Sequence, residues 1–277
     1  MQLDAFQHHY ANHNMKNKLI ALCLVFVWQH ASLKTSQAQD RPAAKSDSIP
    51  KLPNPEMVVV DGGSFIMGST PDPSGKGMIT MQFSHKVTLS SYQIGKYEVT
   101  QAEWLSVMGA NLSLHQGCDN CPVEEVSWND AQLFIHALNE KTGKHYQLPT
   151  AAQWEFAARG GNKSRGYKYA GSNDLDEVAW TGGEFIDQTH PVGRKHPNEL
   201  GIYDMSGNVA EWCSDWFDPN YDPGPQTNPQ GPLPGVGHVV RGSSWGVGPS
   251  EFHVIGGRIG YPDDRSAHVG FRLVLMP

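Results

Sequence analysis

The fold of this chain is decided most directly by the stretch LPTAAQWEFAARGG, residues 148–161. Thr150 and Gln153 have the capping-box spacing that opens a helix, and Trp154 shares one face of that helix with two later alanines. The pair Gly160-Gly161 is placed to end it, because glycine readily adopts the left-handed backbone conformation found after helices. The stretch therefore predicts a short helix with an apolar face.

Two further helices are predicted upstream by the same signals. Each begins with a capping box and ends at a glycine. The first has the box Thr100 and Glu103 and ends at Gly109, and the second has the box Ser127 and Asp130 and ends at Gly143. In the second helix the apolar residues recur at positions i, i+3, i+4 and i+7, the spacing of one buried helical face.

Short β-rich runs precede these helices. Met57–Val60 and Ser64–Met67 are separated by Asp61-Gly62-Gly63, which predicts a hairpin with a glycine-assisted turn. Val87–Leu89 and Tyr92–Ile94 predict two further strands.

The second half of the chain is irregular. From Gly161 onward Gly, Pro, Asn and Asp recur every few residues, and no segment keeps a helical period for three turns. The content of 39% hydrophobic and 18% charged residues is that of an ordinary globular protein. These observations predict a single α+β domain with little regular secondary structure.

The amino-terminal region has the pattern of an export signal. Lys16 and Lys18 precede the apolar run Leu19–Trp28, and Ser36-Gln37-Ala38 offers small residues for cleavage. The run has about half the length of a membrane-spanning helix, so we expect an exported protein that does not span the membrane and is periplasmic, envelope-associated or extracellular. The expected segments are an over-extended start at 1–14, a signal peptide at 15–38, a flexible linker at 39–56 and a folded domain at 57–277.

The charge of the chain limits its partners. The formal net charge is −7, and removal of residues 1–38 takes away three lysines and one aspartate, which leaves about −9. An acidic protein of this kind is not expected to bind nucleic acid, because nucleic-acid backbones attract positive charge.

Eight motifs follow one another over about residues 57–275: GGSFIMG (62–68), YEVT (97–100), PV (122–123), VSW (126–128), the stretch at 148–161, DMSGNVAEW (204–212), VRGSSW (240–245) and GFR (270–272). Their order and spacing resemble those of the sulfatase-modifying-factor (formylglycine-generating enzyme) family. The resemblance implies that family's compact variant of the C-type-lectin-like fold.

The chemistry of the active members is not expected here. In those proteins two cysteines, five positions apart and just after the Gly-Gly-Ser-aromatic motif, bind copper(I) and oxidise a substrate cysteine to formylglycine with oxygen. That chemistry requires soft thiolate ligands. Here the family positions fall near Val247 and Phe252, and no cysteine follows Trp245. The resemblance therefore implies no family-type catalytic residues, and copper is not expected.

Three cysteines lie beyond the expected signal peptide: Cys118, Cys121 and Cys213. The spacing of Cys118 and Cys121 is that of a redox centre, of half a zinc site or of a short-loop disulfide, and export favours the disulfide. A zinc site lacks a second ligand pair, and a redox role lacks the helix-opening βα context of thioredoxin-like motifs. Cys213 is expected to be buried.

The loop 204–211 resembles the family's calcium-binding loop. By that resemblance Asp204 and Glu211 would supply side-chain oxygens, and Gly207 and Val209 would supply carbonyl oxygens. Hard oxygen ligands on a tight turn suit calcium, so one structural calcium ion is expected. The alternative is an acidic loop with a capping glutamate.

Aromatic residues on the later loops are candidates for a ligand cleft, at the place where active relatives bind peptide. Clustered aromatics with an arginine suit a peptide, protein or glycan ligand, although any one of them is equally expected to be a core residue. The candidates are Trp212, Trp216, Trp245, Phe252 and Arg258.

The leading hypothesis is a non-catalytic binding or structural module of the bacterial envelope or secreted space. One alternative is an enzyme, either an oxidoreductase acting on protein cysteine or a variant with iron or another centre. The other is a variable lectin-like protein that displays residues 245–265 to ligands, because a scaffold tolerates divergent loops.

Overall fold

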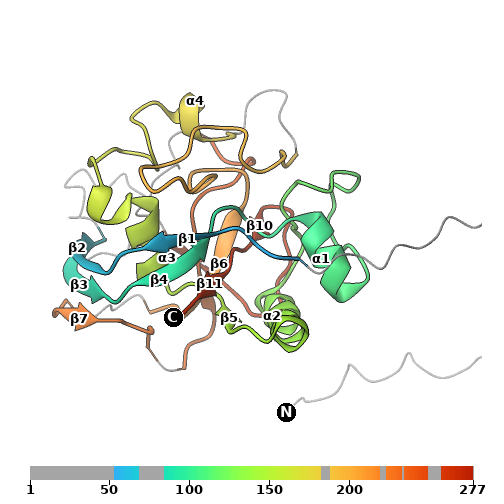
Figure 1. Ribbon diagram of the computed structural model, residues 1–277, viewed down its shortest axis with the longest axis horizontal. Helices are drawn as coiled ribbons and strands as arrows, with labels where there is room; N and C mark the ends of the chain where they lie inside the picture. Colours follow the sequence, from blue (N-terminus) through green and yellow to red (C-terminus); the bar gives the residue numbers. More distant parts are fainter. Residues whose placement is uncertain are drawn as a thin grey trace, which may run out of the picture. The chain divides into compact units, whose positions relative to one another are not determined.

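The computed structural model describes residues 53–68, 84–181, 188–218, 223–232, 234–248 and 257–276. All of these residues belong to one compact unit, Ile49–Pro277. The expected signal peptide lies outside the described residues. The architecture is a mixture of short strands, three main helices and long connecting segments (Figure 1), so the α+β class is confirmed.

The three predicted helices are confirmed with their caps. They are α1 (Gln101–Met108), α2 (Trp128–Thr142) and α3 (Ala151–Ala158), and each begins with a complete capping box. Gly109 and Gly143 follow α1 and α2 with φ values of 78° and 67°, the left-handed region that favours glycine. Beyond α3 the described helices are a single 3-10 turn, Gly161–Lys163, and α4 (Leu175–Val178).

The strands form three small sheets. The first has the order β1 (Met57–Val60), β4 (Tyr92–Gly95), β11 (Val274–Leu275), β5 (Tyr146–Gln147), and α2 lies beside β5 (Figure 1). The second has the order β10 (Val269–Gly270), β6 (Ala210–Trp216), β8 (His238–Arg241), β9 (Gly257–Gly260). The third has the order β2 (Gly63–Met67), β3 (His85–Leu89), β7 (Gln226–Thr227).

The predicted hairpin between the first two strands is wrong. β1 pairs with β4 and β2 pairs with β3, so the chain crosses from one sheet to the next at Gly62. A Cβ at Gly62 would lie 2.7 Å from the Leu89 carbonyl oxygen, and Asn162 Nδ2 donates a hydrogen bond to the Gly62 carbonyl at 2.9 Å. The glycines therefore permit a close crossing of two segments and do not form a reverse turn.

Two apolar clusters form the core. One surrounds α3, whose eight residues are all buried, and includes Trp154 and Phe156. The other joins α1 and α2 to the second sheet, and in it Trp104 stacks on Phe134 at 5.3 Å between ring centroids. In the described part of the chain, no helix has the length and apolarity that crossing a bilayer requires.

Candidate functional site

Trp245 lies just after β8 and is the centre of a cluster of aromatic and histidine side chains. Its backbone N–H donates to the Asn208 carbonyl at 2.9 Å, and its indole Nε1–H donates to the Ala267 carbonyl at 3.1 Å. Only 9% of the surface of Trp245 is exposed. The ring packs against His268, at 4.3 Å between centroids, and edge-on against His115, at 5.3 Å.

His268 can pack beside Trp245 because the residue after Trp245 is a glycine, Gly246. A Cβ at Gly246 would lie 2.2 Å from the His268 ring, so any side chain there would displace the imidazole. Burial, followed by the charges of Arg258 and His115, lowers the pKa of His268. The ring is therefore uncharged at pH 7 and can donate or accept one hydrogen bond at each nitrogen.

His115 lies on the loop after α1 and is held by two polar contacts. Gln101 Nε2 donates to the His115 carbonyl at 2.9 Å, and the His115 backbone N–H donates to Glu124 Oε1 at 2.8 Å. The same Glu124 oxygen lies 3.4 Å from His115 Nδ1. Glu124 is fully buried, and the next residue, Glu125, has a positive φ of 58°, an uncommon conformation for a residue other than glycine.

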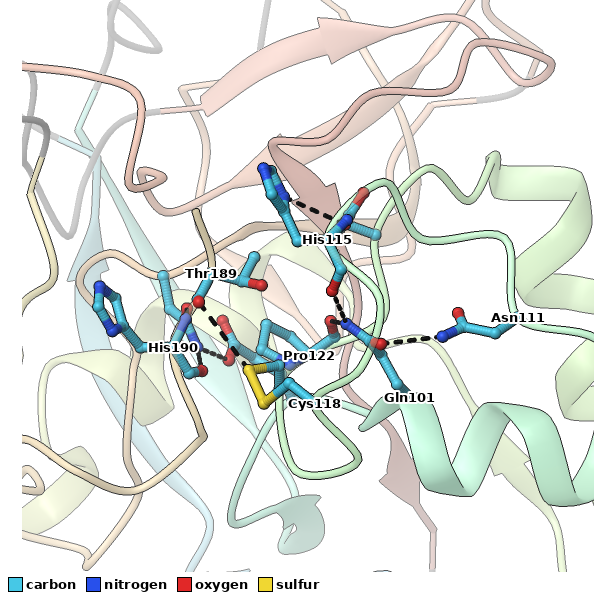
Figure 2. Close-up of a disulfide and its surroundings, with 11 residues drawn as sticks. Gln101, Asn111, His115, Cys118, Pro122, Thr189 and His190 are labelled. Atoms are coloured by element: carbon cyan, nitrogen blue, oxygen red, sulfur yellow. Dashed lines mark hydrogen bonds and ion pairs between the residues drawn. A yellow bond between two sulfur atoms is a disulfide. The ribbon is translucent and has the colours of Figure 1, made fainter. Parts of the chain in front are cut away.

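Asn208 connects Trp245 to a third histidine. Its side chain accepts from the His190 backbone N–H at 3.0 Å and donates to the His190 carbonyl at 3.1 Å, while its own carbonyl binds Trp245. His190 stacks on Trp180 at 3.8 Å between ring centroids. Figure 2 shows the His115 and His190 side chains on one side of the disulfide, with Thr189 between them.

We call this set of residues, namely His115, Trp180, His190, Trp245 and His268, the Trp245 site. Several polar atoms in and beside it are buried and have no hydrogen-bond partner among the described residues. A buried polar atom without a partner costs about 1–3 kcal/mol, so a ligand that supplied hydrogen bonds here would gain affinity. These atoms are Glu124 Oε2, Trp180 Nε1, Thr189 Oγ1, His190 Nε2 and His268 Nδ1.

The structure brings together only some of the predicted cleft residues. Trp245 belongs to the site, and Arg258, on β9, lies close enough for its charge to act on His268. Among the described residues, Trp216, the last residue of β6, stacks on His238 and not on a ring of the Trp245 site. Phe252 lies outside the described residues.

The prediction for Trp212 is wrong. Only 2% of its surface is exposed, and its Nε1–H donates to the Val126 carbonyl at 2.9 Å inside the core. Because β6 is covered on this face, the indole has no open side for a ligand. Val247, near which one family cysteine position is expected, packs against the small apolar cluster of Tyr169, Leu175, Val178 and Ala179.

The cysteines hold no accessible thiol in the described structure. Cys118 and Cys121 are joined in a disulfide. Cys213 is free but completely buried in β6, and burial raises the pKa of its thiol well above the ordinary value. A thiol of this kind does not form the thiolate that binds a soft metal.

The predicted calcium loop belongs to a buried cluster of three carboxylates and one guanidinium. Arg272 donates to both oxygens of Glu211, each at 2.7 Å. Glu98 accepts from Asn208 Nδ2 at 2.7 Å and from the Val209 backbone N–H at 3.1 Å. Asp204 Oδ2 accepts from the Gly193 backbone N–H at 2.7 Å.

This cluster has more negative than positive groups. Burial raises the pKa of Asp204 to about 6, and burial together with the charges of Asp204 and Glu211 raises the pKa of Glu98 well above its usual range. Asp204 Oδ1 is buried without a partner, and Glu211 Oε1 has acceptor capacity left. No group of three His, Cys, Asp or Glu side chains converges on one point in the described residues. The predicted set has two side chains and two carbonyls, so the lack of such a group does not test it.

The three histidines and Trp180 were missed by sequence reasoning. Residues 115, 180, 190 and 268 are far apart in the chain and belong to no motif that relates them. The signal that was available is indirect: Asn208 and Trp245 lie in two recognised motifs, and the structure joins both to the histidines.

The fold and site define a C-type-lectin-like α+β domain, in which short sheets carry long ordered loops. The model of the family described as "Sulfatase-modifying factor enzyme 1-like domain" matches residues 42–277. The chain belongs to this family.

Relatives and solved structures agree with that assignment. The chain is 38% identical over 212 residues to "Chaperone protein LppX" of Paenibacillus barcinonensis, covering 58% of this chain and 71% of that protein. It is 34% identical over 196 residues to the formylglycine-generating enzyme of Streptomyces coelicolor, covering 61% of this chain and 59% of the enzyme. "Treponema denticola variable protein 1" superimposes with a TM-score of 0.72 at 30% identity, over 80% of this chain and 95% of that one.

Proposed function

We propose that this protein is an exported, non-catalytic binding or structural module of the formylglycine-generating-enzyme family, and that the Trp245 site holds its ligand. The ligand is a peptide, a protein or a glycan. Formylglycine generation by the family route is absent, and copper is not a cofactor.

One observation carries the non-catalytic part of the proposal, namely the state of the cysteines. The family reaction needs two thiolates beside the reacting cysteine. In this chain Cys118 and Cys121 form a disulfide, Cys213 is buried in β6, and Val247, near an expected family cysteine position, packs against an apolar cluster. The alternative, an enzyme with iron or another centre, has no support from these contacts.

The binding part of the proposal rests on the polar atoms without partners beside Trp245. Aromatic surfaces with a few convergent polar groups are typical of ligand sites. His190 and His268 are uncharged at pH 7, because burial lowers the pKa of both, so they suit a ligand that exchanges neutral hydrogen bonds. A relative named a chaperone is consistent with a role in holding another molecule.

Hydrogen exchange measured by mass spectrometry tests the binding proposal. The probes are a sulfatase-type peptide with its cysteine replaced by serine, and a set of defined oligosaccharides. We expect one probe class to protect the segments around His115, His190 and His268, and Gly246→Ala to weaken that protection by displacing His268. Leu133→Ala, an exposed change on α2, is the matched control. Protection elsewhere, or none with either class, would contradict the assignment of the site.

A second candidate function is ligand display by loops that vary between strains. The similarity to a protein named "variable protein 1" favours it, and Trp245 and Arg258 flank a segment that such variation would change. Sequencing the gene in sibling strains tests it: we expect substitutions concentrated between 245 and 265, and a uniform distribution would contradict it.

We also propose one structural calcium ion, held by the Asp204 and Glu211 side chains with the carbonyls of Gly207 and Val209. The excess negative charge of the cluster and the unpartnered Asp204 Oδ1 support this proposal. The ion would hold the 204–211 loop in place and would supply no catalytic chemistry.

A further inference from the structure

The Cys118–Cys121 disulfide closes a loop with only two residues between the cysteines. A cross-link stabilises a fold mainly by restricting the unfolded chain, and the effect is smallest for the shortest loops. This disulfide therefore contributes less to the stability of the fold than a long-range cross-link would.

Four backbone hydrogen bonds already hold the same loop. The Cys121 N–H donates to the Cys118 carbonyl at 3.0 Å, which closes the turn, and the N–H groups of Gln101 and Ala102 donate to the carbonyls of Cys121 and Asp119 at 2.9 and 3.0 Å. The Val192 N–H donates to the Asn120 carbonyl at 2.9 Å. None of these bonds needs the sulfur–sulfur bond, so the two cysteines would stay close together after reduction.

The two sulfurs have different surroundings. Cys118 is half-buried, whereas only 2% of Cys121 is exposed. Cys121 Sγ lies 3.9 Å from the Thr189 carbonyl oxygen, an acceptor for its S–H group once the bond is open. Figure 2 shows the disulfide between Gln101 on α1 and the segment of Thr189 and His190.

From these contacts we propose that, beyond the non-catalytic binding role, Cys118–Cys121 is a thiol–disulfide exchange centre that oxidises one dithiol of a peptide or protein per chain and is itself reduced in the exchange. A thiolate of the substrate attacks Cys118 Sγ, the sulfur–sulfur bond breaks, and Cys121 leaves as a thiolate that takes up a proton. The second substrate thiolate then attacks the substrate sulfur that is bonded to Cys118. This forms the substrate disulfide and releases Cys118 as a thiolate, which takes up a proton. The substrate loses two electrons and two protons and gains a disulfide, and the two cysteines gain the same electrons and protons.

Anaerobic incubation of the oxidised full chain with a synthetic peptide that carries two cysteines tests this proposal. After acid quenching and alkylation, mass spectrometry counts the thiols on both molecules, and circular dichroism follows the fold. We expect one peptide disulfide for each chain reduced at Cys118 and Cys121, with an unchanged spectrum. Transfer that occurs only after the chain is denatured would overturn the proposal, because the disulfide would then be purely structural.

Single-cysteine variants test the assigned order of attack. With an oxidised peptide, Cys121→Ser should form a mixed disulfide through Cys118 at least about tenfold faster than Cys118→Ser does through Cys121, because exposure controls access to the thiol. Equal rates would overturn the order. Cys213→Ser is the matched control and should transfer its disulfide as the unmodified chain does. If a single variant does not fold, the experiment on the unmodified chain still decides the proposal.

Discussion

Asp215 is a buried acid whose protonation ties stability to pH. Its Oδ2 accepts from the Ala151 backbone N–H at 2.8 Å, and Oδ1 has no partner among the described residues. Ser214 Oγ and the Arg241 charge also act on the carboxyl, but burial is the largest effect and raises the pKa of Asp215 to about 6. In the unfolded chain the pKa is about 3.9.

The folded state therefore binds this proton more tightly than the unfolded state does. Protonated Asp215 makes its full contribution to the free energy of unfolding below about pH 4. This contribution, up to ~3 kcal/mol, is lost as the pH rises through about 6. We expect Asp215→Asn, which stays neutral and can still accept from Ala151, to remove this part of the pH dependence. Urea unfolding between pH 4 and 8 measures it. Parallel stability curves for the variant and the unmodified chain would show that Asp215 does not titrate as described.

At the scale of single elements, the α2 amino terminus gives the clearest expectation. Ser127 Oγ accepts from the Asp130 backbone N–H at 3.1 Å and donates to Asp130 Oδ2 at 2.8 Å. Ser127→Ala should lower the free energy of unfolding by about 1 kcal/mol, the usual effect of losing a cap. Glu140→Gln, exposed on the same helix, should change it by less than about 0.5 kcal/mol. Equal effects of the two changes in denaturant unfolding would show that the cap contributes nothing.

The same element shows why some features could be predicted and others could not. Capping boxes are local, because each cap residue (Thr100, Ser127 or Thr150) bonds to the residue three positions after it. All three helices were therefore predicted correctly. Strand pairing is not local. The β1 to β4 pairing joins residues about 35 positions apart, and nothing near Gly62 distinguishes a turn from a crossing.

The candidate site was predictable only where a motif contributed to it. Trp245 and Asp204 lie in motifs of the family and were proposed from them, while His115, His190 and His268 are brought together by contacts with Trp245 and Asn208 that span the chain. Trp212 was placed in the cleft because its motif is adjacent, but strand alternation and cover by the core bury its side chain.

For the whole molecule, the carboxylate cluster links segments that are distant in the sequence. Asp204 and Glu211 lie in one loop, and Glu98 and Arg272 come from distant parts of the chain. An ion that binds only the folded loop would raise the free energy of unfolding of the whole domain. We expect calcium at about a hundred times its dissociation constant to raise the free energy of unfolding by ~2.7 kcal/mol. Scanning calorimetry with calcium or with EGTA measures this.

Two variants make the calcium test specific. Asp204→Asn keeps a residue type that tolerates the positive φ of 57° at this position but removes a charge from the cluster, so the calcium effect should shrink. Glu56→Gln removes an exposed carboxylate that pairs with Lys96 and should leave the effect unchanged. Identical melting with calcium and with EGTA would contradict the ion site.

The central proposal is that this family member keeps the fold and does not carry out the formylglycine reaction. The most direct measurement incubates the purified chain with a cysteine-containing sulfatase peptide, copper(I), reductant and oxygen, beside an active formylglycine-generating enzyme, and reads the peptide by mass spectrometry. We expect the control to convert the cysteine to the aldehyde and this protein to leave the thiol peptide unchanged. Conversion of the peptide by this protein would contradict the claim and would require a mechanism without a cysteine pair.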